Sequence, residues 1–120
     1  MDSRLKLTLL QAIARQEGFN TPGTRAQRNH NPGNIRYGRF AKAHFAIGGD
    51  EAGYAIFGSD EDGFLALKIL LEGPAYRDLT LGAALDRFAP AADGNCPAVY
   101  VNNVCEWTGA APSTLISALI

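Results

Sequence analysis

Apolar residues recur at helical spacing over most of the chain, and this periodicity is the strongest constraint on its fold. The first stripe, in residues 4–17, consists of Leu5, Leu9, Leu10, Ile13 and Ala14. It covers one face of a helix, and Gly18 follows as a natural helix stop. The pattern therefore predicts an amphipathic helix over residues 4–17.

Further helices are predicted downstream from capping residues and apolar stripes. They begin at Ser59, Thr80 and Pro97 and end at Gly73, Pro90 and Gly109. Asp62 follows Ser59 by three residues and forms a near capping box, and Thr80 is a favoured N-cap residue. The apolar faces are Phe64, Leu67, Leu70 and Leu71; Leu81, Ala84, Leu85 and Phe88; and Tyr100, Val101, Val104 and Cys105. A last short helix is expected around Leu115, Ile116 and Leu119.

The segment after the first helix has a different character. Residues 19–34 are rich in Asn, Gly, Pro and Thr, which favours a loop. Residues 34–37 and 54–57 alternate like two short strands, and Gly48-Gly49-Asp50 marks a turn near the second. We expect an α+β fold that is mostly helical, with a small β-hairpin inserted after the first helix.

Composition limits the class of protein. The chain has 120 residues, 47% of them hydrophobic and 19% charged, with a net charge of −1. These values predict one globular domain over residues 1–120 and no general affinity for nucleic acid. The first seven residues mix charges into the apolar run, so no secretory signal is predicted. No stretch is apolar enough to span a membrane, and we expect a monomer without membrane insertion.

The sequence predicts neither a disulfide nor a metal site. Helical geometry separates Cys96 and Cys105 by about 13 Å, whereas a disulfide needs less than about 7 Å between Cα atoms. Together with His30 and His44, these cysteines lack the paired short spacings of zinc sites. No cofactor is implied.

Glu17 is the acidic residue most suggestive of catalysis. It continues the apolar stripe and stands at the C-terminal end of the first predicted helix. Apolar neighbours and the negative end of the helix dipole both disfavour the ionised carboxylate, so they raise its expected pKa. A glycosidase needs such a protonated carboxylic acid to donate a proton to the leaving oxygen. The alternative is a solvated glutamate at an ordinary helix end.

Three segments carry a resemblance to a known family. They are Ala12–Phe19, Arg28–Gly38, and the C-terminal stretches Ala89-Pro90, Ala98–Val101 and Cys105–Gly109. In this order they resemble the lysozyme-like superfamily, which includes phage and prophage muramidases and lytic transglycosylases. The resemblance spans roughly residues 9–110. It implies a lysozyme-like fold with Glu17 as the catalytic acid, and cleavage of the β-1,4 bond between N-acetylmuramic acid and N-acetylglucosamine.

A second catalytic carboxylate is harder to identify. Residues 18–49 contain no acidic side chain, and the first ones after them are Asp50 and Glu51, in the predicted turn. Both are candidates, although solvated turn acids are a common alternative. Lytic transglycosylases, which this sequence resembles, use one carboxylate as acid and then as base. We therefore slightly favour that mechanism over hydrolysis.

The acid-free segment is basic. It contains Arg25, Arg28, Arg36, Arg39, Lys42, His30 and His44. Such charges would attract the carboxylates of peptidoglycan stem peptides. Nucleic acid is a less favoured partner because the aromatic residues do not form a spaced stacking platform. A loop solvated by long side chains is the structural alternative.

Four further residues are candidates for substrate binding. Asn31 and Asn34 flank a Pro-Gly turn, where their amides either bind sugar acetamido groups, position Glu17, or stabilise the turn itself. Tyr37 and Tyr100 are candidate sugar-stacking residues, and a tyrosine near the catalytic acid is found in related transglycosylases. Phe57 is expected in the core.

The sequence thus predicts an enzyme that degrades peptidoglycan, with glycan strands as its partner. One alternative is a silent glycan-binding or virion structural module on the same fold, and another is a chitin-type glycosidase. Because no leader is predicted, access to the wall would depend on a holin, a secretion system, a virion or an undetected upstream segment.

Overall fold

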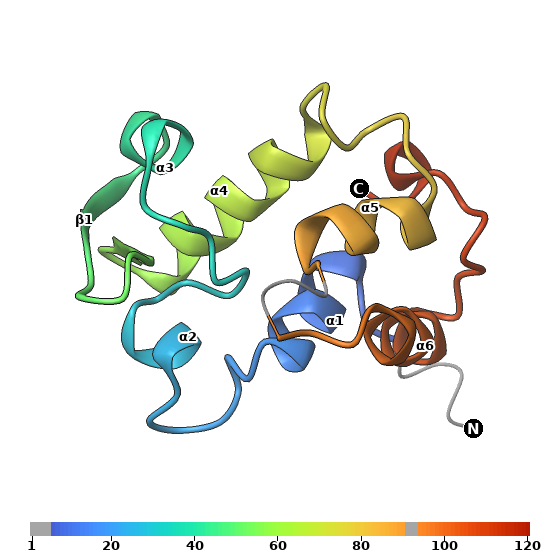
Figure 1. The fold of residues 1–120 in the computed structure, drawn as a ribbon, viewed down its shortest axis with the longest axis horizontal. Coiled ribbons are helices and arrows are strands. Elements are labelled where there is room, and N and C mark those ends of the chain that lie inside the picture. The colour runs from blue at the N-terminus through green and yellow to red at the C-terminus, as the bar shows by residue number, and fades with distance from the viewer. Residues whose placement is uncertain (1–5, 91–93) are drawn as a thin grey trace. The chain divides into compact units, whose positions relative to one another are not determined.

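The structure of the chain is a computed structural model that describes residues 6–90 and 94–120. It is an α+β protein, and its described part contains one two-stranded antiparallel sheet. The backbone divides into two units. The Glu17 unit comprises Ile13–Ile69, and the Tyr100 unit comprises the described residues up to Ala12 together with Leu70–Ile120. Figure 1 shows the order of the elements along the chain.

The first helix, α1, is shorter than predicted and spans Leu9–Gln16. A reciprocal capping box sets its start: the Gln11 amide donates to Thr8 Oγ1 at 3.2 Å, and the Thr8 amide donates to Gln11 Oε1 at 3.0 Å. Residues 6–8 are therefore outside the helix, which corrects the predicted start at residue 4. Leu5 lies outside the described residues.

The predicted loop over residues 19–34 contains a short helix, α2, at Arg25–Arg28. Thr24 caps it, because its Oγ1 accepts a hydrogen bond from the Gln27 amide at 3.3 Å. The expectation of an uninterrupted loop is therefore wrong. A Thr followed three residues later by Gln was the sequence signal for this helix.

The hairpin uses a different first strand from the one predicted. Strand β1 is Ala46–Gly49 and pairs antiparallel with β2, Ala55–Phe57. The predicted strand at 34–37 contributes only an isolated bridge between Arg36 and Tyr54. Asn34 has a left-handed backbone, φ +46°, which stops a regular strand there. Helix α3, Arg39–Ala43, fills the segment before β1.

The turn of the hairpin also differs from the prediction. Gly48 and Gly49 belong to strand β1, and the chain reverses over residues 50–53. The Gly53 amide closes this turn by donating to the Asp50 carbonyl at 3.1 Å. Glycine is common in turns, which favours a turn at Gly48, but here the aspartate side chain organises the reversal.

The later helices follow their predicted boundaries. Helix α4 is Asp60–Glu72, with the Asp62 amide bonded to Ser59 Oγ at 3.1 Å; α5 is Leu81–Phe88, capped by Thr80; and α6 is Pro97–Thr108. Gly109 ends α6 with φ +77°. The chain finishes with a 3-10 helix, η3, at Ile116–Ala118. The predicted Asp93-Gly94 turn includes a residue outside the described ones.

The fully buried side chains come mainly from the predicted stripes. They include Leu9, Ile13, Phe57, Leu67, Leu71, Leu81, Leu85, Val104 and Ile116. Phe57 is a core residue, as expected. Cys96 and Cys105 are both free thiols, which confirms that prediction.

Candidate functional site

Glu17 occupies the C-cap position of α1. The Gly18 amide donates to the Arg15 carbonyl at 3.1 Å, and the Phe19 amide donates to the Ala14 carbonyl at 2.9 Å. With Gly18 at φ +83°, these two bonds form a Schellman motif. The motif turns the chain away immediately after Glu17 and leaves its carboxyl group part-buried at the helix end.

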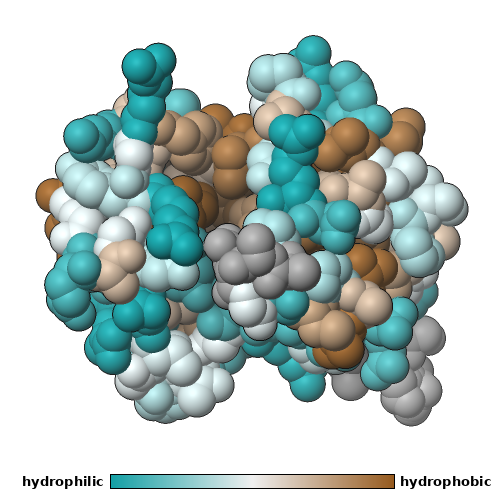
Figure 2. Space-filling model, in the orientation of Figure 1, coloured by the Kyte–Doolittle hydropathy of each residue, from teal (hydrophilic) through white to brown (hydrophobic). Residues whose placement is uncertain are grey.

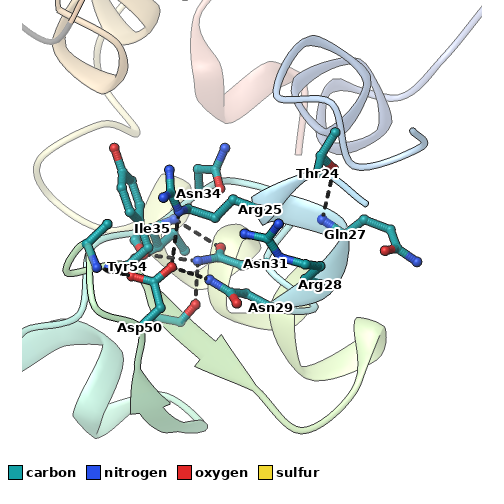
Figure 3. Close-up of polar contacts among 12 residues, drawn as sticks. Thr24, Arg25, Gln27, Arg28, Asn29, Asn31, Asn34, Ile35, Asp50 and Tyr54 are labelled. Carbon is teal, nitrogen blue, oxygen red and sulfur yellow. Dashed lines mark hydrogen bonds and ion pairs between the residues drawn. The ribbon is translucent and has the colours of Figure 1, made fainter. Parts of the chain in front are cut away.

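The loop opposite Glu17 is held by Asn31. This side chain is completely buried, and its amide nitrogen donates to the carbonyls of Ile35 and Ala55 at 3.0 and 2.9 Å. Its oxygen accepts the Ile35 amide at 2.9 Å. Figure 3 shows Asn31 pointing between the loop and the hairpin. Its contacts are therefore those of a residue that braces the loop against β2, the structural alternative.

Asn34 is the partner that the loop brings to Glu17. The backbone N–H of Asn34 donates to the Asn31 carbonyl at 3.0 Å and closes the Pro-Gly turn. Its side-chain nitrogen donates to Glu17 Oε1 at 3.0 Å. The Oδ1 atom of Asn34 is buried and has no hydrogen-bond partner among the described residues. The structure thus brings together two predicted residues that lie 17 positions apart.

Asp50 lies at the centre of a second polar cluster. Its Oδ1 accepts the backbone amides of Ala52 and Tyr54, both at 2.9 Å. Its Oδ2 accepts Asn29 Nδ2 at 3.0 Å and Arg25 Nε at 3.1 Å. Figure 3 shows Arg25, Asn29 and Tyr54 around this carboxylate. The Tyr54 amide first, then Asn29 and the other donors, lower the pKa of Asp50 to about 2.

This arrangement gives Asp50 a structural task. The carboxylate, with a side chain 10% exposed, ties α2 to the hairpin turn through both of its oxygens. Glu51 is an exposed residue of the same turn. Asp50 is therefore an ionised and fully engaged group, and Glu51 is a solvated one.

Most of the basic residues of this segment are exposed, and several of them also make contacts within the protein. The guanidinium groups of Arg25 and Arg36 lie 4.8 and 4.5 Å from the centroid of the Tyr54 ring. Arg28, Arg36, Arg39 and Lys42 are exposed, and Arg28 also donates to the Gly23 carbonyl at 3.0 Å. Figure 2 shows a mostly hydrophilic surface over α2, whereas β1 carries the exposed apolar Ile47. Arg25 is also paired with Asp50, so its charge is partly neutralised inside the protein.

Tyr37 precedes α3, packs against the hairpin and is 38% exposed. Its amide donates to the Gly53 carbonyl at 2.9 Å, and Lys42 Nζ lies 5.3 Å from its ring centroid. A Cβ atom at Gly49 would lie 2.5 Å from Tyr37 Cδ2, so the ring packs directly on the strand backbone. Tyr37 is thus an accessible aromatic ring of the Glu17 unit.

Tyr100 belongs to the other unit. It lies on α6, its side chain is buried at 2% exposure, and it takes part in further contacts of its own. Among the other predicted site residues, Asn34 contacts Glu17, and Asn31 is hydrogen-bonded within the loop that carries Asn34. Asp50 and Glu51 lie in the hairpin turn.

Sequence reasoning missed two polar pairs. Asn29 was not singled out, yet it bonds to Asp50. His30 Nδ1 lies 2.7 Å from Asp60 Oδ1, and His30 has a left-handed backbone with φ +52°. Both partners are more than 20 positions apart in sequence, and no local pattern signals such pairs.

In the described part of the chain, no three His, Cys, Asp or Glu side chains gather in a way that could hold a metal ion. No helix within residues 6–90 and 94–120 is long and apolar enough to cross a bilayer.

Comparison of the chain with models of protein families, with curated proteins and with solved structures finds no match.

Proposed function

We propose that the chain is a peptidoglycan glycosidase of the lysozyme-like kind, with Glu17 as its general acid. The contact between Asn34 Nδ2 and Glu17 Oε1 carries this proposal. The two residues come from two segments that resemble the same family, and in three dimensions they meet through their functional groups. Asn34 presents its amide to Glu17 from a left-handed backbone, φ +46°, which asparagine adopts more readily than most residues.

The proposed reaction begins with proton transfer. Protonated Glu17 donates to the glycosidic oxygen that links N-acetylmuramic acid to N-acetylglucosamine, and the C1–O bond breaks. The group that attacks C1 decides the reaction class. In an inverting hydrolase it is water activated by a second carboxylate, and in a retaining hydrolase it is that carboxylate itself, which forms a glycosyl-enzyme that water then hydrolyses. In a transglycosylase it is the C6 hydroxyl of the muramic acid.

The contacts of Asp50 favour the second route. A general base or nucleophile must have a free oxygen, and both oxygens of Asp50 already accept two hydrogen bonds each. In the favoured route the C6 oxygen bonds to C1, and its proton passes to the Glu17 carboxylate, which restores the acid. The product is a 1,6-anhydro sugar, and one carboxylate is sufficient.

The exposed basic residues support a wall polymer as the substrate. Arg28, Arg39 and Lys42 would attract the carboxylates of the stem peptides, while Tyr37 offers a ring for stacking on a sugar. The partner proposed is a glycan strand of peptidoglycan.

Release of dye from labelled cell walls tests the function. We expect release by the unmodified protein and none by Glu17→Gln, with Glu51→Gln as a matched control that remains active. Stronger activity on chitin in a parallel assay would favour a chitin-type glycosidase. Binding of the wall without any release would favour a silent glycan-binding or virion module.

A further inference from the structure

The Asn34 side chain has unequal contacts at its two ends. Its Nδ2 atom donates to Glu17 Oε1 at 3.0 Å, whereas its Oδ1 atom is buried without a hydrogen-bond partner in the described part of the protein. A buried amide oxygen is almost always hydrogen-bonded in folded proteins, so this one calls for a functional explanation.

The backbone around Asn34 is fixed by hydrogen bonds. The backbone N–H of Asn34 donates to the Asn31 carbonyl at 3.0 Å. The backbone N–H and carbonyl of the next residue, Ile35, are both hydrogen-bonded to the Asn31 side chain. The Cα and Cβ atoms of Asn34 are therefore held in place. Rotation about the Cβ–Cγ bond exchanges the two ends of the amide without moving the chain.

We propose that Asn34 is a positioning residue that holds Glu17 in both of its protonation states, by turning its side-chain amide. The amide nitrogen donates to the carboxylate, as observed. After rotation the amide oxygen accepts from the protonated carboxyl group. Because Oδ1 has no other donor in the described structure, this rotation breaks no hydrogen bond of that oxygen.

The side-chain amide of the neighbouring Asn31, in contrast, is hydrogen-bonded at both ends. Its nitrogen has two carbonyl acceptors and its oxygen has one amide donor, so rotation would break all three bonds. The catalytic meaning of the Asn34 rotation rests on the proposed function, in which Glu17 gives up a proton and takes one back in every cycle. A partner that served only one state would stop contributing to the position of the Glu17 carboxyl group in half of each cycle.

Nuclear magnetic resonance titration tests the proposal without an activity assay. The 13C signals of the Glu17 carboxyl group and of the Asn34 side-chain carbonyl are followed with pH, in the unmodified protein and in Asn34→Gly. Glycine accepts the left-handed backbone at this position, so the variant keeps the turn. Asn20→Gly, at an exposed asparagine, is the matched control.

We expect the Asn34 carbonyl signal to move together with the Glu17 titration, as the oxygen gains a donor. The signals of Asn31 should not follow it. In Asn34→Gly the measured pKa of Glu17 should stay close to that of the unmodified protein, because a partner of both states favours neither. Turnover of soluble glycan oligomers should fall about 10- to 100-fold, the effect of a loosely held catalytic group.

A rise of roughly one unit in the Glu17 pKa of Asn34→Gly would overturn the proposal, because it would mean that Asn34 stabilises the carboxylate alone. An Asn34 carbonyl signal that ignores the Glu17 titration would also overturn it, and this observation needs no variant. The two proposals can be told apart. If the Asn34 carbonyl signal follows the Glu17 titration but the protein cleaves no glycan, the glycosidase proposal is refuted and the rotation of Asn34 stands. If the protein cleaves glycan but the Asn34 signal ignores the titration, the glycosidase proposal stands and the rotation is refuted.

Discussion

The side-chain amide of Asn34 donates to the Glu17 carboxyl group at 3.0 Å and so connects the end of α1 to the turn that precedes the hairpin. Each side of this contact is fixed by its own backbone hydrogen bonds, the Schellman motif after Glu17 and the Pro-Gly turn before Asn34. A polar pair with both members anchored in this way has a defined geometry, as a proton-transfer group requires.

Gly63 is expected to be essential for packing the loop on α4. A Cβ atom at this position would collide with the backbone carbonyl oxygen of His30 and lie 2.7 Å from Pro32 Cδ. We predict that Gly63→Ala destabilises the protein by about 1–3 kcal/mol, although alanine favours helices. Gly82→Ala in α5 is the control, since its Cβ meets only an ordinary contact at 3.5 Å and should be neutral or stabilising. Urea unfolding compares the two, and equal effects would contradict the packing described.

Asp50 should make the folding stability of the protein depend on pH. Its folded pKa, about 2, lies below the usual 3.8, so its contribution is present above pH 4 and is lost as the pH falls toward 2. We predict that Asp50→Asn has a lower Tm than the unmodified protein at pH 6 and that the difference narrows between pH 4 and 2. Thermal unfolding followed by circular dichroism at several pH values checks this. A constant difference over that interval would show that Asp50 contributes by shape and not by charge.

The arginines should separate into two functional groups. Neutralising the exposed Arg28 and Arg39 to Gln should weaken binding to intact peptidoglycan, more strongly at low salt, and leave the Tm nearly unchanged. Arg25→Gln should instead lower the Tm, because it removes a donor to Asp50. Wall co-sedimentation at two salt concentrations, with thermal unfolding of each variant, distinguishes the groups. Turnover of short uncharged glycan oligomers should change much less; equal losses on both substrates would mean that the arginines shape the site.

Local chemistry in the sequence was sufficient to predict most of the helices. Ser59, Thr80 and Pro97 each begin a helix in the structure because capping and proline geometry act within one turn. Two local signals were nevertheless overlooked, the Thr8–Gln11 box and the Thr24 cap. They correct the start of α1 and reveal α2.

The hairpin could not be predicted in the same way. The Ala-Ile-Gly-Gly sequence of β1 has no alternation, and its pairing is decided by partners farther along the chain. The hydrogen bonds to Asp50 Oδ2 likewise come from distant residues, Arg25 and Asn29, which are 25 and 21 positions away. The contact between Glu17 and Asn34 is long-range too. In the sequence, these residues are connected only because their two segments resemble the same family.

The most direct measurement of the central claim is mass spectrometry of the muropeptides released from purified peptidoglycan by the unmodified protein and by Glu17→Gln. The amide keeps the shape of the side chain but cannot donate the proton, so the variant should fold with an unchanged or higher Tm and release nothing. We predict that the unmodified protein releases 1,6-anhydro products, one water lighter than hydrolysed ones. Reducing ends alone would exclude the one-carboxylate route, and Asp50→Asn and Glu51→Gln would then be examined for the missing group. A Glu17→Gln variant that still releases muropeptides at the normal rate would contradict the account.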